Sequence, residues 1–139
     1  MRQEADLISF GLPHREPFLF IDRVLACEPG VEATGEKVFL PEDRIFRGHF
    51  PGNPIVPGVL LTEALAQLAG IAGASERGFL LSGIRAMKFP APARPGERIV
   101  LLARQTGSLG GLFQFAVRAD VEGRTVAEGV VVLNELQLD

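Results

Sequence analysis

The residues best suited to chemistry lie in one short segment, Gly48 to Gln67. It contains His49, in a loop rich in glycine and proline, and Glu63, which follows after 63 − 49 = 14 residues. Histidine changes its charge close to neutral pH, so its neutral form is available as a base. A base and a carboxylic acid in one segment predict chemistry that moves protons.

Glu63 stands in an otherwise apolar stretch, where an ionised carboxylate is costly to bury. Desolvation favours the protonated carboxyl group, which is the form that a general acid needs. Gln67 lies four residues further on, on the same helix face, so its amide can hold the carboxyl group in orientation. A structural alternative stays open, in which Glu63 points out of the core or pairs with a surface arginine.

Gly58 follows Pro57 at the expected start of the helix that carries Glu63. The first N–H groups of a helix lack internal partners and carry partial positive charge, so they can bind an oxygen that becomes anionic. Two structural alternatives stay open. In one, Pro57-Gly58 serves only to start the helix; in the other, His49 only forms a hydrogen bond with the backbone. His14, near the N-terminus, is interpreted as structural. Base, acid and oxyanion site together match proton abstraction beside a carbonyl group.

The elements that must position these groups are one helix and several strands. The apolar residues of 59–74 cover nearly every side of a helix, which predicts that the helix is buried all round and wrapped by the rest of the chain. Residues 41–57 contain four prolines and predict an ordered loop without regular structure. A short helix or turn is expected over residues 6–11.

Strands are expected where β-branched and aromatic residues gather between turn signals. Glu28-Pro29-Gly30, residues 107–111 and Glu122-Gly123 are the turn signals. The strand ranges are 18–28, 31–40, 79–89, 98–106, 112–121 and 124–136. The sequence therefore predicts an α+β fold of five to six mostly antiparallel strands around one long central helix.

Composition excludes several classes of protein. A chain of 139 residues with 47% hydrophobic residues fits one globular domain over residues 1–139, and a net charge of −3 does not favour nucleic acid. Cys27 is the only cysteine, so neither an internal disulfide nor a structural zinc site is expected. The N-terminus lacks a signal-peptide pattern, and the long apolar stretch contains Glu63, so we expect a soluble cytoplasmic protein without membrane insertion.

Motifs along almost the whole chain, from about Leu12 to Leu133, resemble a known family. They resemble the bacterial 3-hydroxyacyl-acyl-carrier-protein dehydratases of the FabZ type, and the spacing of His49 and Glu63 is that of the family. The matching segments are Leu12-Pro13-His14-Arg15, Pro17-Phe18, Asp22-Arg23-Val24, Gly48-His49-Phe50-Pro51-Gly52, Pro54, Pro57-Gly58-Val59-Leu60, Glu63-Ala64 with Ala66-Gln67, Met87-Lys88-Phe89, Arg94-Pro95-Gly96-Glu97, Val121-Glu122-Gly123 and Ala127.

The resemblance implies the hot-dog fold, in which a curved antiparallel sheet wraps one long helix. It implies dehydration of (3R)-hydroxyacyl-acyl-carrier-protein to the trans-2-enoyl thioester in fatty acid biosynthesis, without a metal or redox cofactor. Members act as homodimers, often as trimers of dimers, with the site at the dimer interface.

By this resemblance His49 of one subunit removes the C2 proton, and Glu63 of the other protonates the departing C3 hydroxyl group. The Gly58 N–H polarises the thioester carbonyl group, and Gln67 steadies Glu63. The acyl chain is expected in an apolar tunnel whose walls include Phe50, Val59 and Phe89.

Two departures bear on the kind of dehydratase. The related enzyme that also isomerises the double bond has aspartate where this chain has Glu63, and Pro-Gly-Cys where this chain has Pro57-Gly58-Val59. This difference favours the plain dehydratase. The chain has no tyrosine, whereas several relatives place one near the tunnel mouth. Gating of the tunnel by a tyrosine is therefore not expected.

A local excess of positive charge could dock the acidic carrier protein. Residues 84–98 carry four basic residues against Glu97, a local charge of 4 − 1 = +3. A solvated strand face explains the same charges equally well. The basic residues are Arg85, Lys88, Arg94 and Arg98.

Rival functions on the same fold remain open. A thioesterase also uses a carboxylate at the central helix, but His49 at this spacing argues against one. An acyl-CoA hydratase differs in its carrier, and the sequence does not settle acyl-chain length or carrier. A non-catalytic acyl-binding subunit has no need of a buried acid such as Glu63.

Overall fold

The computed structural model describes residues 10–137, in which one long helix lies against one six-stranded antiparallel sheet. The expected helix or turn over residues 6–11 lies mostly outside the described residues; Phe10 and Gly11 form a turn. The sheet order is β1-β2-β4-β5-β6-β3. The elements are β1 (Arg23–Glu28), β2 (Glu32–Lys37), the 3-10 helix η1 (Arg44–Arg47), α2 (Gly58–Gly73), β3 (Phe79–Lys88), β4 (Ile99–Leu109), β5 (Leu112–Val121) and β6 (Arg124–Glu135).

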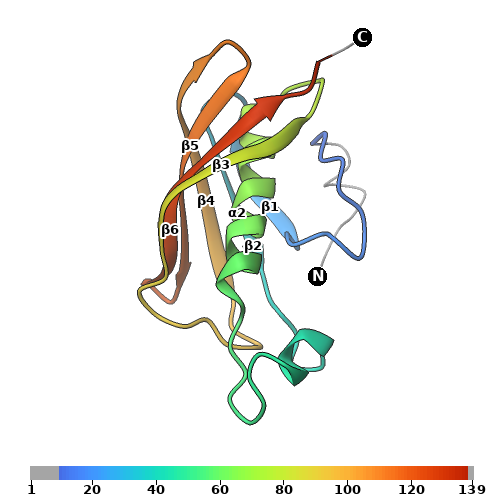
Figure 1. The fold of residues 1–139 in the computed structure, drawn as a ribbon, viewed down its shortest axis with the longest axis vertical. Coiled ribbons are helices and arrows are strands. Elements are labelled where there is room, and N and C mark those ends of the chain that lie inside the picture. The colour runs from blue at the N-terminus through green and yellow to red at the C-terminus, as the bar shows by residue number, and fades with distance from the viewer. Residues whose placement is uncertain (1–9, 138–139) are drawn as a thin grey trace.

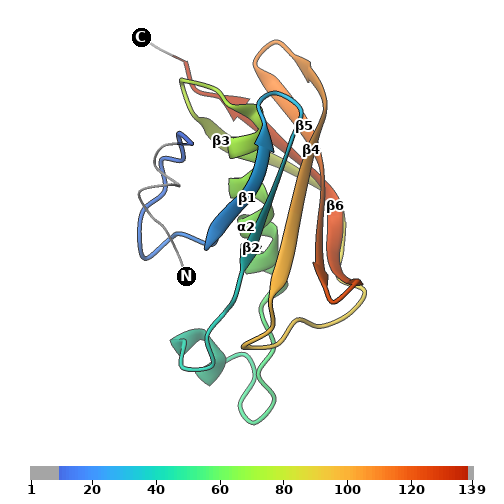
Figure 2. The same ribbon diagram turned by 180° about the vertical axis from the view of Figure 1, so that it is seen from behind.

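The sheet curves around α2, as the two opposite views show (Figures 1 and 2). Leu65 and Leu68 of the helix are fully buried on its sheet-facing side. Leu101 of β4 and Phe115 of β5 are fully buried as well. Burial of these apolar side chains is the main stabilising contribution to the fold. The expected curved antiparallel sheet around one central helix is thus confirmed.

One face of α2 is not buried, which corrects the prediction that the helix is covered on all sides. Val59 is 75% exposed, and Glu63 and Gly70 are partly exposed. Glu63, Ala66 and Gly70 follow one another at helical spacing. Their side chains are small except at Glu63, so this face leaves room beside the helix.

The last hairpin follows the sequence pattern closely. In β5, which matches the expected range 112–121, the side chains of Phe115, Val117 and Ala119 are buried and alternate with less buried residues. Glu122 and Gly123 have φ angles of 49° and 77° and join β5 to β6 in a two-residue turn. Positive φ at both central residues gives the strand twist that such hairpins need.

The first strand is shorter than predicted, because the backbone of Phe18 and Phe20 bonds to a side chain of the helix instead of to a neighbouring strand. The Phe20 N–H donates to Oε1 of Gln67, and Nε2 of Gln67 donates to the Phe18 carbonyl group, each at 3.0 Å. β1 begins only at Arg23. Similarly, β4 continues to Leu109, so the turn after it is only Gly110-Gly111, and the predicted irregular loop over 41–57 includes η1.

Within residues 10–137, strand β3 lies at one edge of the sheet and pairs only with β6. Its side chains Leu80 and Ile84 are 61% and 51% exposed. An exposed apolar edge strand is a template for pairing with another chain. Among residues 10–137, no helix has the length and apolar character needed to cross a membrane.

Candidate functional site

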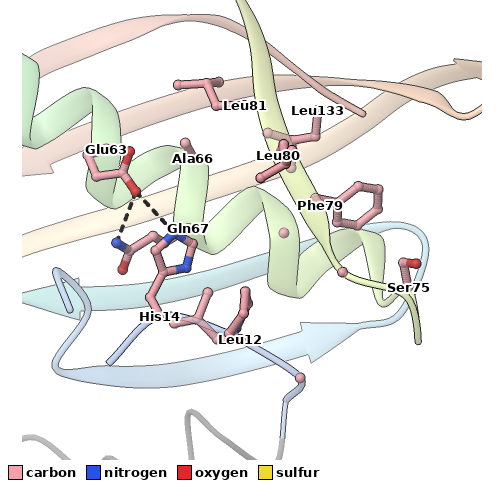
Figure 3. Close-up of a pocket in the computed structure, with 14 residues that line it drawn as sticks. Leu12, His14, Glu63, Ala66, Gln67, Ser75, Phe79, Leu80, Leu81 and Leu133 are labelled. Atoms are coloured by element: carbon pink, nitrogen blue, oxygen red, sulfur yellow. Dashed lines mark hydrogen bonds and ion pairs between the residues drawn. The ribbon is translucent and has the colours of Figure 1, made fainter. Parts of the chain in front are cut away.

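A pocket of about 530 Å³, partly open to solvent, lies along the uncovered face of α2. The helix α2 forms one wall, the segment 11–14 forms a second, and β3 with β6 forms a third (Figure 3). Its lining is mostly apolar, including Leu12, Ala66, Phe79, Leu81 and Leu133. The pocket thus combines an apolar lining with a few polar groups, which is typical of a small-molecule site.

Glu63 and Gln67 supply the polar groups on the helix wall. Nε2 of Gln67 donates to Oε2 of Glu63 at 3.0 Å, as the four-residue spacing predicted. Gln67 is only 1% exposed and also bonds the backbone of Phe18 and Phe20. These backbone bonds hold the Gln67 amide in one orientation. The amide in turn orients the Glu63 carboxyl group. The Glu63 side chain keeps 18% exposure and lines the pocket.

His14 lines the same pocket, on the opposite wall (Figure 3). Its Nε2 lies 3.6 Å from Oε2 of Glu63, which is an ion-pair distance when the imidazole is protonated. Its Nδ1 is buried and has no hydrogen-bond partner among residues 10–137. The sequence predicted only a structural role for His14, although His14 stands in one of the segments that resemble the family, Leu12-Pro13-His14-Arg15. It lies 49 positions before Glu63, so local spacing does not predict the contact between them.

His49 does not line this pocket in the single chain. It lies in the loop between η1 and α2, at the end of the molecule beyond the N-terminus of the helix (Figure 1). Nδ1 of His49 lies 2.9 Å from the Ile55 carbonyl oxygen, and its ring stacks on Phe50. This bond leaves the ring as the Nδ1–H tautomer when neutral, with Nε2 free to accept a proton.

Gly58 begins α2, and the side chain of Pro57 makes no capping hydrogen bond. The Gly58 N–H is therefore one of the first donors of the helix. A Cβ at Gly58 would lie 3.0 Å from the ring of Phe89, so packing also favours glycine here. The residues expected to line the acyl tunnel are surface residues in the single chain: Phe50 is 49%, Val59 75% and Phe89 47% exposed.

The basic residues expected to dock a carrier are divided between two places. Arg85 and Lys88 lie on β3, where Arg85 donates to Oε1 of Gln114. Arg94 lies beside the His49 loop and donates to Oδ1 of Asn53 at 2.9 Å. Arg98 pairs with the Glu36 carboxylate, which neutralises part of its charge.

One chain thus holds two separate arrangements. The first is a carboxyl group fixed by an amide in an apolar pocket, beside an imidazole. The second is an imidazole fixed by a backbone carbonyl group, beside the N-terminus of a helix. The first arrangement suits a proton donor, and the second suits a base next to an oxyanion site.

Solved structures share this architecture at low sequence identity. The dehydratase heterocomplex ApeI:P from Xenorhabdus doucetiae matches with a TM-score of 0.76 and 14% identity, over 94% of this chain and 91% of that one. Cj0977, a sigma28-regulated virulence protein from Campylobacter jejuni, matches with a TM-score of 0.73 and 13% identity, over 96% and 89%. The likeness establishes the class: the chain has the hot-dog fold.

Sequence comparison identifies the family within that class. The model of the FabA-like domain matches residues 12–130. The 3-hydroxyacyl-[acyl-carrier-protein] dehydratase FabZ of Ruminiclostridium cellulolyticum is 44% identical over 125 residues, covering 86% of this chain and 88% of that protein. FabZ of Roseiflexus castenholzii is 42% identical over 123 residues, covering 85% and 86%. The chain belongs to the FabZ family of dehydratases.

Proposed function

We propose that this protein dehydrates 3-hydroxyacyl-acyl-carrier-protein to the trans-2-enoyl thioester in fatty acid biosynthesis. The observation that carries the proposal is the Glu63 carboxyl group, held by buried Gln67 in an apolar pocket, in a chain of the FabZ family. His49 removes the C2 proton, and Glu63 protonates the leaving C3 hydroxyl group. The Gly58 N–H binds the thioester oxygen as it becomes enolate-like.

The active site is completed by a second copy of the chain. His49 and Glu63 do not share a pocket within one chain, so the two side chains meet only if another subunit contributes one of them. Two exposed apolar regions suit such a contact, namely the edge strand β3 and the start of α2 with Val59 and Phe50. A homodimer, alone or in a trimer of dimers, would cover these regions. The cytoplasm is the proposed location.

The acyl chain lies in an apolar tunnel completed by the same contact. Phe50 stacks on His49, the Phe89 ring lies beside Gly58, and Val59 follows Gly58 in the helix. Their exposure in the single chain leaves them available to line the tunnel. The carrier protein docks near the tunnel mouth, where Arg94 lies beside the His49 loop; Arg85, Lys88 and Arg98 contribute more distantly.

The reaction is tested with the purified protein and trans-2-enoyl thioesters of acyl carrier protein and of coenzyme A. We expect hydration, the reverse reaction, to remove the conjugated absorbance, with the carrier-protein substrate preferred. Release of free thiol would indicate a thioesterase instead, and preference for coenzyme A would indicate an acyl-CoA hydratase. No turnover of any thioester would leave a binding subunit.

The shared site is tested by mixing inactive variants. We expect His49→Ala and Glu63→Gln each to lose activity. A heterodimer of the two has one site with both residues intact, so random pairing should restore about a quarter of the wild-type activity. If each site lay within one chain, no mixture would regain activity. Light scattering after size exclusion should show a dimer or a multiple of it; an active monomer would contradict the proposal.

A further inference from the structure

The pocket holds a second titratable group that the proposed mechanism does not use. Among the described residues that line it, Glu63 and His14 are the two that titrate. We propose that His14 is a positioning residue that acts through Glu63, holding its carboxyl group and returning the proton that Glu63 loses in each turnover. This inference rests on the proposed role of Glu63 as the acid.

Geometry supports the contact. Both His14 and Gln67 approach Oε2 of Glu63, with Nε2 of His14 at 3.6 Å and Nε2 of Gln67 at 3.0 Å (Figure 3). His14 is itself fixed: Arg15 donates to the His14 and Leu12 carbonyl groups, and the imidazole stacks on Phe18 with ring centroids 6.0 Å apart. A small rotation of the imidazole would turn the ion-pair distance into a hydrogen bond.

The proton balance of dehydration gives the pair a task. When the C3–O bond breaks, Glu63 gives its proton to the departing hydroxyl group and becomes a carboxylate, while the C2 proton moves to His49. The electron pair of the C2–H bond forms the double bond. Before the next turnover, His49 must lose a proton and Glu63 must gain one. His14 takes a proton from water and passes it from Nε2 to Oε2.

Exposure and charge both suit this task. The His14 side chain is 31% exposed, against 18% for Glu63, so His14 is the more accessible of the two to water. Glu63 is the only charged residue of α2. Among residues 10–20, the described part of the N-terminal segment, Arg15 is engaged with backbone carbonyl groups, and Glu16 is the other charged residue. At the far end of the pocket Ser75 bonds Glu135, which Arg77 also approaches.

The delivery of a proton by His14 predicts a specific pH effect. In acid, solvent supplies a proton to Glu63 directly, so the loss of His14 should cost little rate there. At higher pH protons in solution are scarce, so a side chain that delivers one to Oε2 matters more. Without His14 the rate should therefore fall more steeply as the pH rises.

The experiment compares His14→Gln with His14→Asn, two variants that keep a polar side chain but cannot carry the proton. We expect kcat to fall by about ten- to a hundredfold at neutral pH. The fall should be smaller in acid, and KM should change little. In His14→Ala, added imidazole should restore part of the rate. Arg15→Gln is the matched control: it loosens the same segment, so its loss should be equal at every pH and insensitive to imidazole.

Mixing variants separates the role of His14 from that of His49. His14 and Glu63 lie on one chain, so a heterodimer of His14→Gln with Glu63→Gln has no complete site and should show no more activity per intact Glu63 than the His14→Gln dimer. A heterodimer of His14→Gln with His49→Ala should regain one site. A pH-independent loss in both His14 variants, or restored activity with Glu63→Gln, would overturn the inference. Full activity of Glu63→Gln alone would instead overturn the proposed function.

Discussion

The carboxyl region around Glu63 and the imidazole region around His49 are held in different ways. Glu63 stands on a packed helix and is oriented by Gln67, which is 1% exposed and bonded on both sides. His49 stands in a loop held by backbone hydrogen bonds, such as Val56 N–H to the Ala93 carbonyl group at 2.8 Å. The acid therefore depends on the core, whereas the base depends on two surface loops. Damage to the first should cost stability and activity together, and damage to the second mainly activity.

Gln67→Leu should show the largest effect. The apolar side chain fits the buried position but leaves the Phe20 N–H and the Phe18 carbonyl group without their partner. Each orphaned buried group costs about 1–3 kcal/mol, so we expect a loss of about 3 kcal/mol in the free energy of unfolding. Activity should fall as well, because Glu63 loses its orienting bond. Denaturant unfolding and steady-state kinetics measure the two losses; full stability would refute the claim that Gln67 ties the N-terminal segment to the helix.

A pair of glycines on α2 tests the packing of the carboxyl region. A Cβ on Gly73 would lie 2.7 Å from Cε2 of Phe79, whereas a Cβ on Gly70 meets nothing closer than 3.9 Å. Gly73→Ala should therefore destabilise the protein by about 1–3 kcal/mol through overpacking.

Gly70→Ala is the matched control, because it makes the same change on the same helix where there is space. It should be neutral or raise stability by up to about 1 kcal/mol, since alanine favours the helix. Gly70 lines the pocket, so an added methyl group there should affect the turnover of longer acyl chains more than that of shorter ones. Thermal unfolding of both variants decides the matter: equal melting temperatures would contradict the difference in packing.

Local sequence patterns predicted most of the fold, because they record whether a side chain faces the core. The turn signals on either side placed β5 correctly, and Pro57-Gly58 marked the start of α2. The pattern was less reliable over residues 18–22, where aromatic residues resemble a strand. The backbone of Phe18 and Phe20 is bonded by the side chain of Gln67, and a contact between residues 47 positions apart leaves no periodic signal.

The candidate site was predictable only in part, for the same reason. Glu63 and Gln67 are one helical turn apart, so their bond follows from spacing. The approach of His14 to Glu63 depends on how the N-terminal segment crosses the helix, which spacing does not encode. The residue types alone predicted that His49 and Glu63 act together, whereas their meeting across two chains was implied by the family resemblance and stays a prediction.

Asn53→Ala should show the smallest effect on stability and still lower activity. Asn53 is exposed, and its Oδ1 accepts from Arg94, which ties the His49 loop to the loop before β4. Surface substitutions of this kind change the free energy of unfolding by about 0.5 kcal/mol or less. If loops alone position the base, kcat should fall several-fold while the melting temperature stays unchanged.

Arg94→Ala removes the other partner of the same bond and therefore serves as the comparison. If Arg94 only braces the loop, both variants should lower kcat equally, with carrier-protein and coenzyme A substrates alike. If Arg94 also docks the acidic carrier, Arg94→Ala should raise KM for the carrier-protein substrate. Added salt should then reduce the difference in this KM between the variant and the wild type, because salt screens exposed charges. Unchanged kinetics in both variants would mean that His49 does not depend on this contact. That result would contradict the claim that surface loops position the base.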